Sequence, residues 1–227
     1  MPSKYFQRNF TKNNFYHIYN RGSHKQTIFK NHQDYQTFTD ILSYYLKFPT
    51  GTALSRLPRN LKERNLQETT PTFRLICYCL MPNHFHLLLQ QHLHPTTTNN
   101  ISNLMKRVSL AYAMYFKNKY DHSGNLQEGR FKNVTINTEE QLLYLTKYIH
   151  LNPSKLEGTQ PSNLSIYQYS SYPIYIDQIP APQWLNPNEI LNLSYYQNTK
   201  NPHQAYKKFV EGKQTNPEII SKLTLEN

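Results

Sequence analysis

The sequence is poor in several residue types, and each shortage excludes a class of protein. Its 227 residues include 2 cysteines, 6 glycines and 1 tryptophan. Cys77 and Cys79 stand two apart in one apolar run, where their side chains are badly placed to bridge each other, so we expect a reducing cytoplasm rather than a disulfide-stabilised secreted domain. No glycine-rich phosphate loop occurs. No apolar run approaches the length of a membrane span, and residues 1–10 lack the apolar stretch of a secretory signal, so we expect a soluble, cytoplasmic protein.

Acidic residues are also few, and the balance of charge indicates a class of partner. The chain has 25 Lys and Arg against 14 Asp and Glu, a net charge of +11, with 19 Tyr and 11 Phe. A cationic surface rich in aromatic rings suits a polyanion whose bases can stack, although an ordinary solvated basic surface is the simpler alternative. Residues 1–30 hold six basic and no acidic residues, and residues 99–133 hold six basic against two acidic. We interpret these two segments as walls of a groove that contacts phosphates.

Two histidines stand in an apolar run that follows a Pro-Asn turn. In an extended strand successive side chains point to opposite faces, so His84 and His86 project from the same face. Two imidazoles on one rigid strand are typical of a metal-ligand pair, and such a site needs another protein ligand from a different element. The simpler alternative is a pair of strand histidines with satisfied hydrogen bonds. The second pair, His92 and His94, runs into Pro95, and we interpret it as loop surface.

A helix downstream can supply the missing ligand. Thr138 followed by Gln141 is typical of a capping box, and Pro153 stops the helix. Tyr148 and Asn152 then lie one turn apart on the same face. An amide oxygen that can bind a metal is thus predicted beside a phenol that can act as a nucleophile.

The order of elements predicts an α+β fold, an antiparallel sheet covered by helices, rather than a doubly wound parallel sheet. We expect one catalytic domain at residues 1–157, with a loop insertion at 49–71. Residues 158–227 form a small tail with three short helices that begin near Asn-Pro pairs. The predicted strands are Phe15 to Asn20, Phe73 to Leu80, His84 to Gln90 and Arg130 to Asn137, and the predicted helices run from Asn31 to Phe48, from about Ile101 to Tyr115 and from Thr138 to Asn152.

Four blocks of the sequence, in order and at similar spacing, resemble the signature blocks of the REP-associated tyrosine transposases. These enzymes belong to the HUH single-strand transposases and nucleases, and the resemblance covers roughly residues 14 to 175. It implies an HUH fold with a ferredoxin-like or RRM-like core. The blocks are Tyr19-Asn20-Arg21-Gly22, Leu80-Met81-Pro82-Asn83-His84-Phe85-His86-Leu87-Leu88-Leu89, Gly129-Arg130-Phe131-Lys132 and Tyr148-Ile149-His150-Leu151-Asn152-Pro153.

The resemblance implies a metal-dependent enzyme that nicks and joins single-stranded or hairpin DNA through a 5′-phosphotyrosine intermediate. Tyr148 is then the nucleophile, and His84, His86 and Asn152 hold a divalent ion, Mg²⁺ or Mn²⁺. We expect a monomer rather than a dimer. The residues that we expect to contact DNA are Asn20, Arg21, Lys106, Arg107, Arg130 and Lys132.

The sequence departs from the family at two places and leaves two other functions open. Gln168-Tyr169 stands where the family has Trp, and Ser154-Lys155 follows Pro153 where it often has Val-Arg, which bears on hairpin recognition. One alternative is a nucleic-acid-binding module without catalysis. The other is a zinc hydrolase that uses the same histidines, although the histidine strand offers no Asp or Glu as a base.

Overall fold

The described residues form a four-stranded antiparallel sheet with helices on both faces, so the predicted α+β class is confirmed. The computed structural model describes residues 8–49, 71–156, 161–213 and 216–224. The predicted insertion at 49–71 lies almost entirely outside them. The sheet order is β2-β3-β1-β4, where β1 is Phe15–Arg21, β2 is Phe73–Met81, β3 is His84–Gln91 and β4 is Lys132–Ile136.

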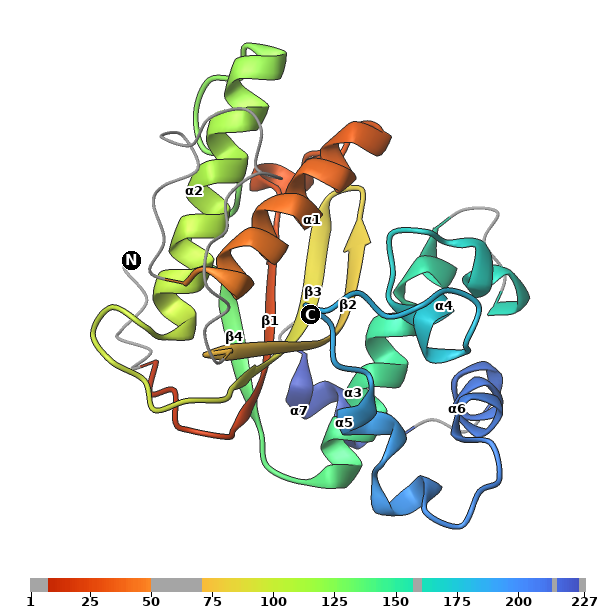
Figure 1. Cartoon of the computed structure of the whole chain (residues 1–227). Coiled ribbons are helices and arrows are strands. Elements are labelled where there is room, and N and C mark those ends of the chain that lie inside the picture. Colours follow the sequence, from red (N-terminus) through yellow and green to blue (C-terminus); the bar gives the residue numbers. More distant parts are fainter. Residues whose placement is uncertain (1–7, 50–70, 157–160, 214–215, 225–227) are drawn as a thin grey trace.

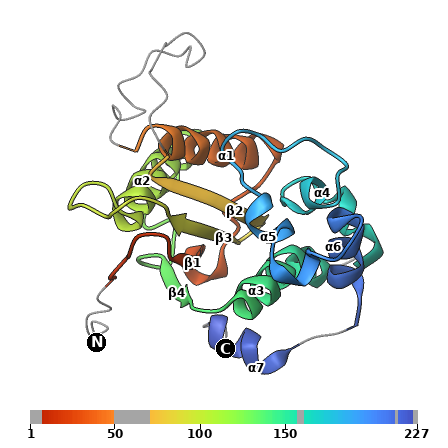
Figure 2. The same cartoon turned by 60° about the horizontal axis from the view of Figure 1, so that its bottom comes forward.

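The alternation of side chains along the strands gives the sheet two apolar faces and therefore two cores. On one face Ile18, Phe85 and Leu87 pack against α1 (His32–Lys47) and α2 (Ile101–Tyr120). On the other face Leu88 and the two cysteines pack against α3 (Glu139–Leu151) and the C-terminal helices. Figure 2 shows these layers, with α1 and α2 above the sheet and α3 and α7 below it. The sheet thus separates two helical layers.

Local signals explain where the elements begin and end. Asn31, Asn100 and Thr138 each accept a hydrogen bond from the backbone N–H three residues later, at the first turns of α1, α2 and α3. Such caps satisfy an amide that the helix leaves without a partner. After β1 the chain turns at Gly22, where a Cβ atom would lie 2.1 Å from the Gln26 carbonyl oxygen, so only glycine fits. The predicted strands and helices agree closely with the structure, except that α2 continues beyond the expected Tyr115 to Tyr120.

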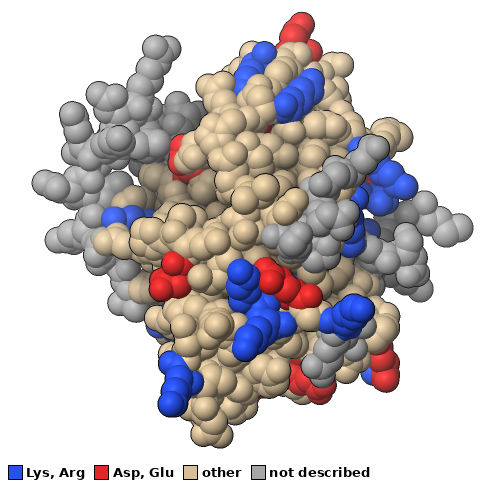
Figure 3. Space-filling model, turned by 90° about the vertical axis from the view of Figure 1, so that its right-hand side faces the viewer, with Lys and Arg blue, Asp and Glu red and all other residues tan. Residues whose placement is uncertain are grey.

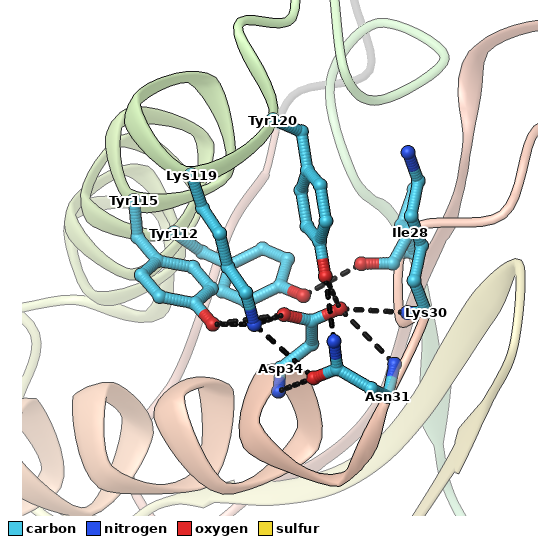
Figure 4. Close-up of polar contacts among 8 residues, drawn as sticks. All are labelled: Ile28, Lys30, Asn31, Asp34, Tyr112, Tyr115, Lys119 and Tyr120. Atoms are coloured by element: carbon cyan, nitrogen blue, oxygen red, sulfur yellow. Dashed lines mark hydrogen bonds and ion pairs between the residues drawn. The ribbon is translucent and has the colours of Figure 1, made fainter.

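A buried carboxylate joins the two helices of the first layer (Figure 4). Asp34 is fully buried near the start of α1, and its oxygens accept hydrogen bonds from Tyr115 (2.8 Å), Lys119 (2.7 Å) and Tyr120 (2.8 Å) of α2. Burial alone would raise the pKa of the Asp34 carboxyl, but these bonds and one from the Lys30 backbone outweigh it and lower the pKa. The network fixes α1 against α2, and Asp34 neutralises the positive charge of Lys119.

The tail packs against α3 and supplies part of the second core (Figure 1). Asn201 and Asn216 cap the helices that they precede, as the Asn-Pro pairs predict. The helix after Asn186 begins at Asn188, and a short helix, α4, was not predicted. In the described residues no helix is long and apolar enough to cross a membrane. The tail helices are α4 (Tyr172–Tyr175), α5 (Asn188–Leu191), α6 (Pro202–Glu211) and α7 (Pro217–Leu223), with 3-10 helices at Pro161–Ile166 and Ser194–Tyr196.

Candidate active site

Strand register brings the sequence blocks to one end of the sheet. Arg21 pairs with His84, and Tyr19 pairs with both His86 and Lys132. Residues directly opposite each other in an antiparallel pair share a face, so these side chains all point toward the layer that contains α3. The histidine pair therefore faces the helix of Tyr148, as the sequence predicts.

Hydrogen bonds fix how His84 is presented. Its ring lies 5.0 Å from the ring of His86, between centroids, and its Nδ1 lies 2.6 Å from the Asn83 Oδ1. The Asn83 Nδ2 donates to the Lys25 carbonyl (3.3 Å), which identifies Oδ1 as the acceptor toward His84. In neutral His84 the proton is then on Nδ1 and the lone pair is on Nε2, the nitrogen that would bind a metal ion.

His86 has a partner that the sequence did not reveal. His17, fully buried on β1, places its Nε2 2.9 Å from the Nδ1 of His86, and its own Nδ1 lies 2.8 Å from the Leu223 carbonyl oxygen. The His17 ring stacks against both Tyr19 (4.7 Å) and His86 (5.1 Å). No local pattern marks His17, because its partners come from β3 and from α7 at the far end of the chain. Only its place two residues before Tyr19, and therefore on the same face of the strand, could have indicated it.

Tyr148 projects from α3 toward the histidines. Its ring is half-buried and meets the His86 ring edge-on, with centroids 5.5 Å apart. The Nζ of Lys155 lies 3.5 Å from the Tyr148 hydroxyl and 4.7 Å from the centre of its ring. The same Nζ donates to the Asn152 Oδ1 at 3.2 Å. The structure therefore places a cation beside the predicted nucleophile, at a position that the sequence showed only as a departure from the family.

Asn152 is fully buried directly after α3, as the first residue of a 3-10 turn (Asn152–Lys155) that has Pro153 in second place. Its Nδ2 donates to the Tyr148 carbonyl (2.9 Å), which orients the amide oxygen away from the helix backbone. That oxygen has two lone pairs, so the bond from Lys155 leaves one for a metal ion. The donor set of two imidazole nitrogens and an amide oxygen fits a divalent ion, while joint coordination by the three residues stays a prediction.

Another tyrosine of α3 and the second histidine pair lie away from this site. Tyr144, one turn before Tyr148, is buried against Phe209 of α6, with ring centroids 5.5 Å apart. His92 lies beyond β3 and contacts Arg74 at 3.1 Å. Among the described residues no group of three or more His, Cys, Asp and Glu side chains could hold a metal ion. Neither Tyr144 nor the second histidine pair therefore competes with the site at His84 and His86.

Two of the predicted DNA contacts have internal partners. The Arg21 guanidinium forms an exposed ion pair with Glu128. The Asn20 side chain donates to Gln127 (3.2 Å) and to the Gly129 carbonyl (3.3 Å), so it holds the loop before β4 against β1. The ammonium of Lys132 lies 6.0 Å above the Tyr19 ring, on the site face. Arg130 is exposed in the loop before β4. Contact of these four residues with DNA stays a prediction.

Lys106 and Arg107 are not brought to the site. Both lie on α2, whose apolar residues pack on the opposite face of the sheet, and the Arg107 guanidinium lies over Tyr45 of α1 at 5.6 Å. The sheet therefore stands between them and the histidines. Figure 3 shows the side of the molecule at α4 and α6, where Lys and Arg side chains are scattered among acidic and uncharged ones. This face carries no continuous basic surface among the described residues.

Comparisons with known proteins agree with the fold. Residues 53–152 match the family model described as "Transposase IS200 like". A solved structure of a REP-associated tyrosine transposase bound to a REP hairpin is similar with a TM-score of 0.52 and 14% sequence identity, over 79% of this chain and 88% of that chain. A protein from Deinococcus radiodurans R1 described as a transposase has a TM-score of 0.37 and 17% identity, over 64% of this chain and 95% of its own. No curated protein matches the sequence.

Proposed function

We propose that this chain is a single-strand DNA endonuclease and strand transferase, and the match of residues 53–152 to the model of the IS200-like transposases supports this proposal. Its substrate is DNA that carries a hairpin, and its intermediate is a 5′-phosphotyrosine link to Tyr148. The solved relative is bound to a REP hairpin, which supports a hairpin as the substrate class for this chain. The proposed cofactor is Mg²⁺ or Mn²⁺.

One observation carries the proposal: the Tyr148 hydroxyl belongs to a ring in edge contact with His86 and has the Lys155 ammonium 3.5 Å away. A phenol with an ordinary pKa near 10 is a poor nucleophile at neutral pH. A positive charge beside its oxygen favours the anionic form that attacks. A tyrosine that served only to pack α3 would need neither the cation nor the histidines.

The reaction exchanges one ester bond for another. The Tyr148 oxygen attacks the phosphorus of the scissile phosphodiester, the new Tyr148 O–P bond forms, and the bond from phosphorus to the 3′ oxygen breaks. The tyrosine proton passes to solvent, and the departing 3′ oxygen takes a proton from water. The covalent link conserves the ester, so a second 3′-hydroxyl can reverse the step without ATP.

The side chains have separate tasks in this scheme. His84, His86 and Asn152 would hold the divalent ion, which when bound polarises phosphate oxygens and neutralises developing charge. Lys155 stabilises the negative charge on the tyrosine oxygen, and α3 fixes the angle of the Tyr148 ring relative to the histidines. Because phosphoryl transfer depends mainly on position and charge, this rigid placement is the main contribution of the protein.

The test is the formation of a covalent adduct. The protein is incubated with single-stranded DNA that carries a hairpin and with Mg²⁺ or Mn²⁺, and a denaturing gel then detects protein that is linked to DNA. We expect an adduct with the wild type and with Tyr144→Phe, the matched tyrosine one turn away, and none with Tyr148→Phe. Cleavage without an adduct would favour the hydrolase, binding without cleavage would favour the non-catalytic module, and either result would overturn the proposal.

A further inference from the structure

The backbone of α7 and the predicted metal ligand His86 are connected by a chain of buried hydrogen bonds. The chain runs from the Leu223 carbonyl through both nitrogens of His17 to the Nδ1 of His86, with lengths of 2.8 and 2.9 Å. His17 and His86 have no exposed surface, and Leu223 is also buried. Buried polar groups in such an arrangement are held in one geometry, because water cannot replace a lost bond.

The acceptor at the end of the chain sets the position of each proton. A carbonyl oxygen can only accept, so the Nδ1 of His17 carries the proton that it donates to Leu223. In neutral His17 the Nε2 is then an acceptor, and the Nδ1 of His86 must be the donor toward it. His86 consequently keeps its lone pair on Nε2. His84 has the same tautomer for a different reason, the amide oxygen of Asn83.

Ring stacking restricts the same residues further. The rings of His17 and Tyr19 stack at an interplanar angle of 26°, and those of His17 and His86 at 21°. Tyr19 also stacks with His86, at 5.8 Å and 25°. Since Tyr19 and His86 face each other across the strands, the three rings form one packed set that prevents His86 from turning.

From this arrangement we propose that His17 is a positioning residue for the metal site and that α7 acts through it, so that the docked C-terminal helix fixes the tautomer and orientation of His86. The proposal rests on the proposed function only in taking His86 as a metal ligand. In this proposal the tail contributes to the site, because the Leu223 carbonyl of α7 bonds to His17 across a sequence separation of 206 residues. Outer partners of metal-binding histidines commonly change metal affinity by about 10- to 100-fold.

The first test observes the tautomers directly and needs no metal ion. In protein labelled with ¹⁵N at histidine, two-bond ¹H–¹⁵N correlation spectra distinguish a ring protonated on Nδ1 from one protonated on Nε2. We expect Nδ1–H for both His17 and His86, with assignments from the signals lost in His17→Gln and His86→Gln. A spectrum in which His86 carries its proton on Nε2 would overturn the proposal.

The second test compares two substitutions of His17 by calorimetric titration with Mn²⁺ in the absence of DNA. His17→Phe keeps a stacked ring but removes the acceptor for His86, so Mn²⁺ affinity should fall about 10- to 100-fold. In His17→Gln the amide oxygen can still accept from His86, so most of the affinity should return. Equal losses in both variants, or no loss in His17→Phe, would contradict the proposal.

A third comparison tests the contribution of α7. Leu223→Ala removes the buried side chain that anchors the end of this helix, and Ile219→Ala removes a partly buried one from the same helix. Mn²⁺ affinity should fall in the first variant and change little in the second. If the wild type bound no Mn²⁺, the proposed function would fail. If it bound Mn²⁺ and all these variants bound it equally, only the role of His17 and α7 would fail.

Discussion

At the scale of single residues, the environment of Tyr148 combines an imidazole, an amide and an ammonium group from two places in the chain. His86 comes from the middle strand, while Asn152 and Lys155 follow Tyr148 directly. Since Asn152 bonds both to the Tyr148 carbonyl and to Lys155, the end of α3 holds nucleophile, amide and cation as one unit. A change at any one of the three should therefore affect the others.

Lys155→Met should slow the formation of the DNA adduct about 100-fold, the size of effect seen when one charge-stabilising group is removed from a site. Methionine keeps most of the length of the side chain but has no charge to stabilise the tyrosine oxygen. Lys155→Arg should recover part of the rate. The measurement is the single-turnover rate at saturating DNA. An unchanged rate with weaker DNA binding would show that Lys155 contacts DNA instead of assisting the nucleophile.

The sequence predicts some of these residues and not others, for a physical reason. His84 and His86, like Tyr148 and Asn152, are neighbours on one element, so strand and helix periods are enough to pair them. His17 contacts a strand and a helix far away in sequence, and Lys155 reaches Tyr148 because the chain continues from α3 into a 3-10 turn, Asn152–Lys155. Contacts between elements depend on the tertiary arrangement, which periodicity does not contain.

At the scale of elements, α3 is held from its buried side by a histidine that takes no part in the proposed chemistry. His150 lies in the second core, with Nδ1 2.6 Å from the Tyr206 hydroxyl of α6 and Nε2 2.7 Å from the Ser171 hydroxyl. Burial lowers the pKa of His150 to about 3. Its neutral form therefore joins α3 to α6 and to the turn before α4.

This histidine should make the protein sensitive to acid. The unfolded chain binds a proton at His150 near its ordinary pKa of about 6.5, whereas the folded protein does so only near 3. Its contribution to stability is complete above the unfolded pKa and is lost as the pH falls from 6.5 toward 3, by about 1.4 kcal/mol per pH unit. His150→Gln should be less stable at pH 7 but should lose less stability on acidification.

The measurement is the free energy of unfolding by urea at several pH values. The exposed His94 provides the control, because His94→Gln should leave the pH dependence of the wild type unchanged. Parallel curves for the wild type and His150→Gln would contradict the assignment.

Prediction of the elements succeeded where the chain carries explicit end signals. Asparagine or threonine caps mark five of the helices, and the strands read as runs of apolar and aromatic residues. The short helix α4 carries no such cap: Ser171 before it makes no side-chain capping bond and instead bonds to Tyr78 and His150. The position of α4 is set by the hydrogen bond between Ser171 and Tyr78 of β2, a contact that the local sequence does not show.

At the scale of the whole molecule, the sheet divides the basic residues into two groups. Arg21, Lys132 and Lys155 share the layer of the candidate site, while Lys106 and Arg107 belong to the layer of α1 and α2. The sequence predicted one groove lined by both groups. Clusters of basic residues in a sequence do not show on which face of the sheet each residue lies, so the sequence could not separate the two groups. Net charge predicts an anionic partner, but the fold decides which cations can contact it together.

Single-stranded DNA should therefore bind through the cations on the site layer, with an affinity that falls steeply with salt. Each phosphate neutralised should contribute about −0.7 to the slope of log affinity against log salt. Lys132→Ala should weaken binding and flatten the slope by somewhat less than one contact, and the matched variant Lys106→Ala should change neither.

Arg21 is already paired with Glu128, so Glu128→Gln should strengthen binding by releasing that cation for phosphate. Fluorescence anisotropy over a range of salt concentrations measures all three. Equal losses for Lys132→Ala and Lys106→Ala would show that DNA contacts both layers, and a slope near zero would refute electrostatic binding altogether.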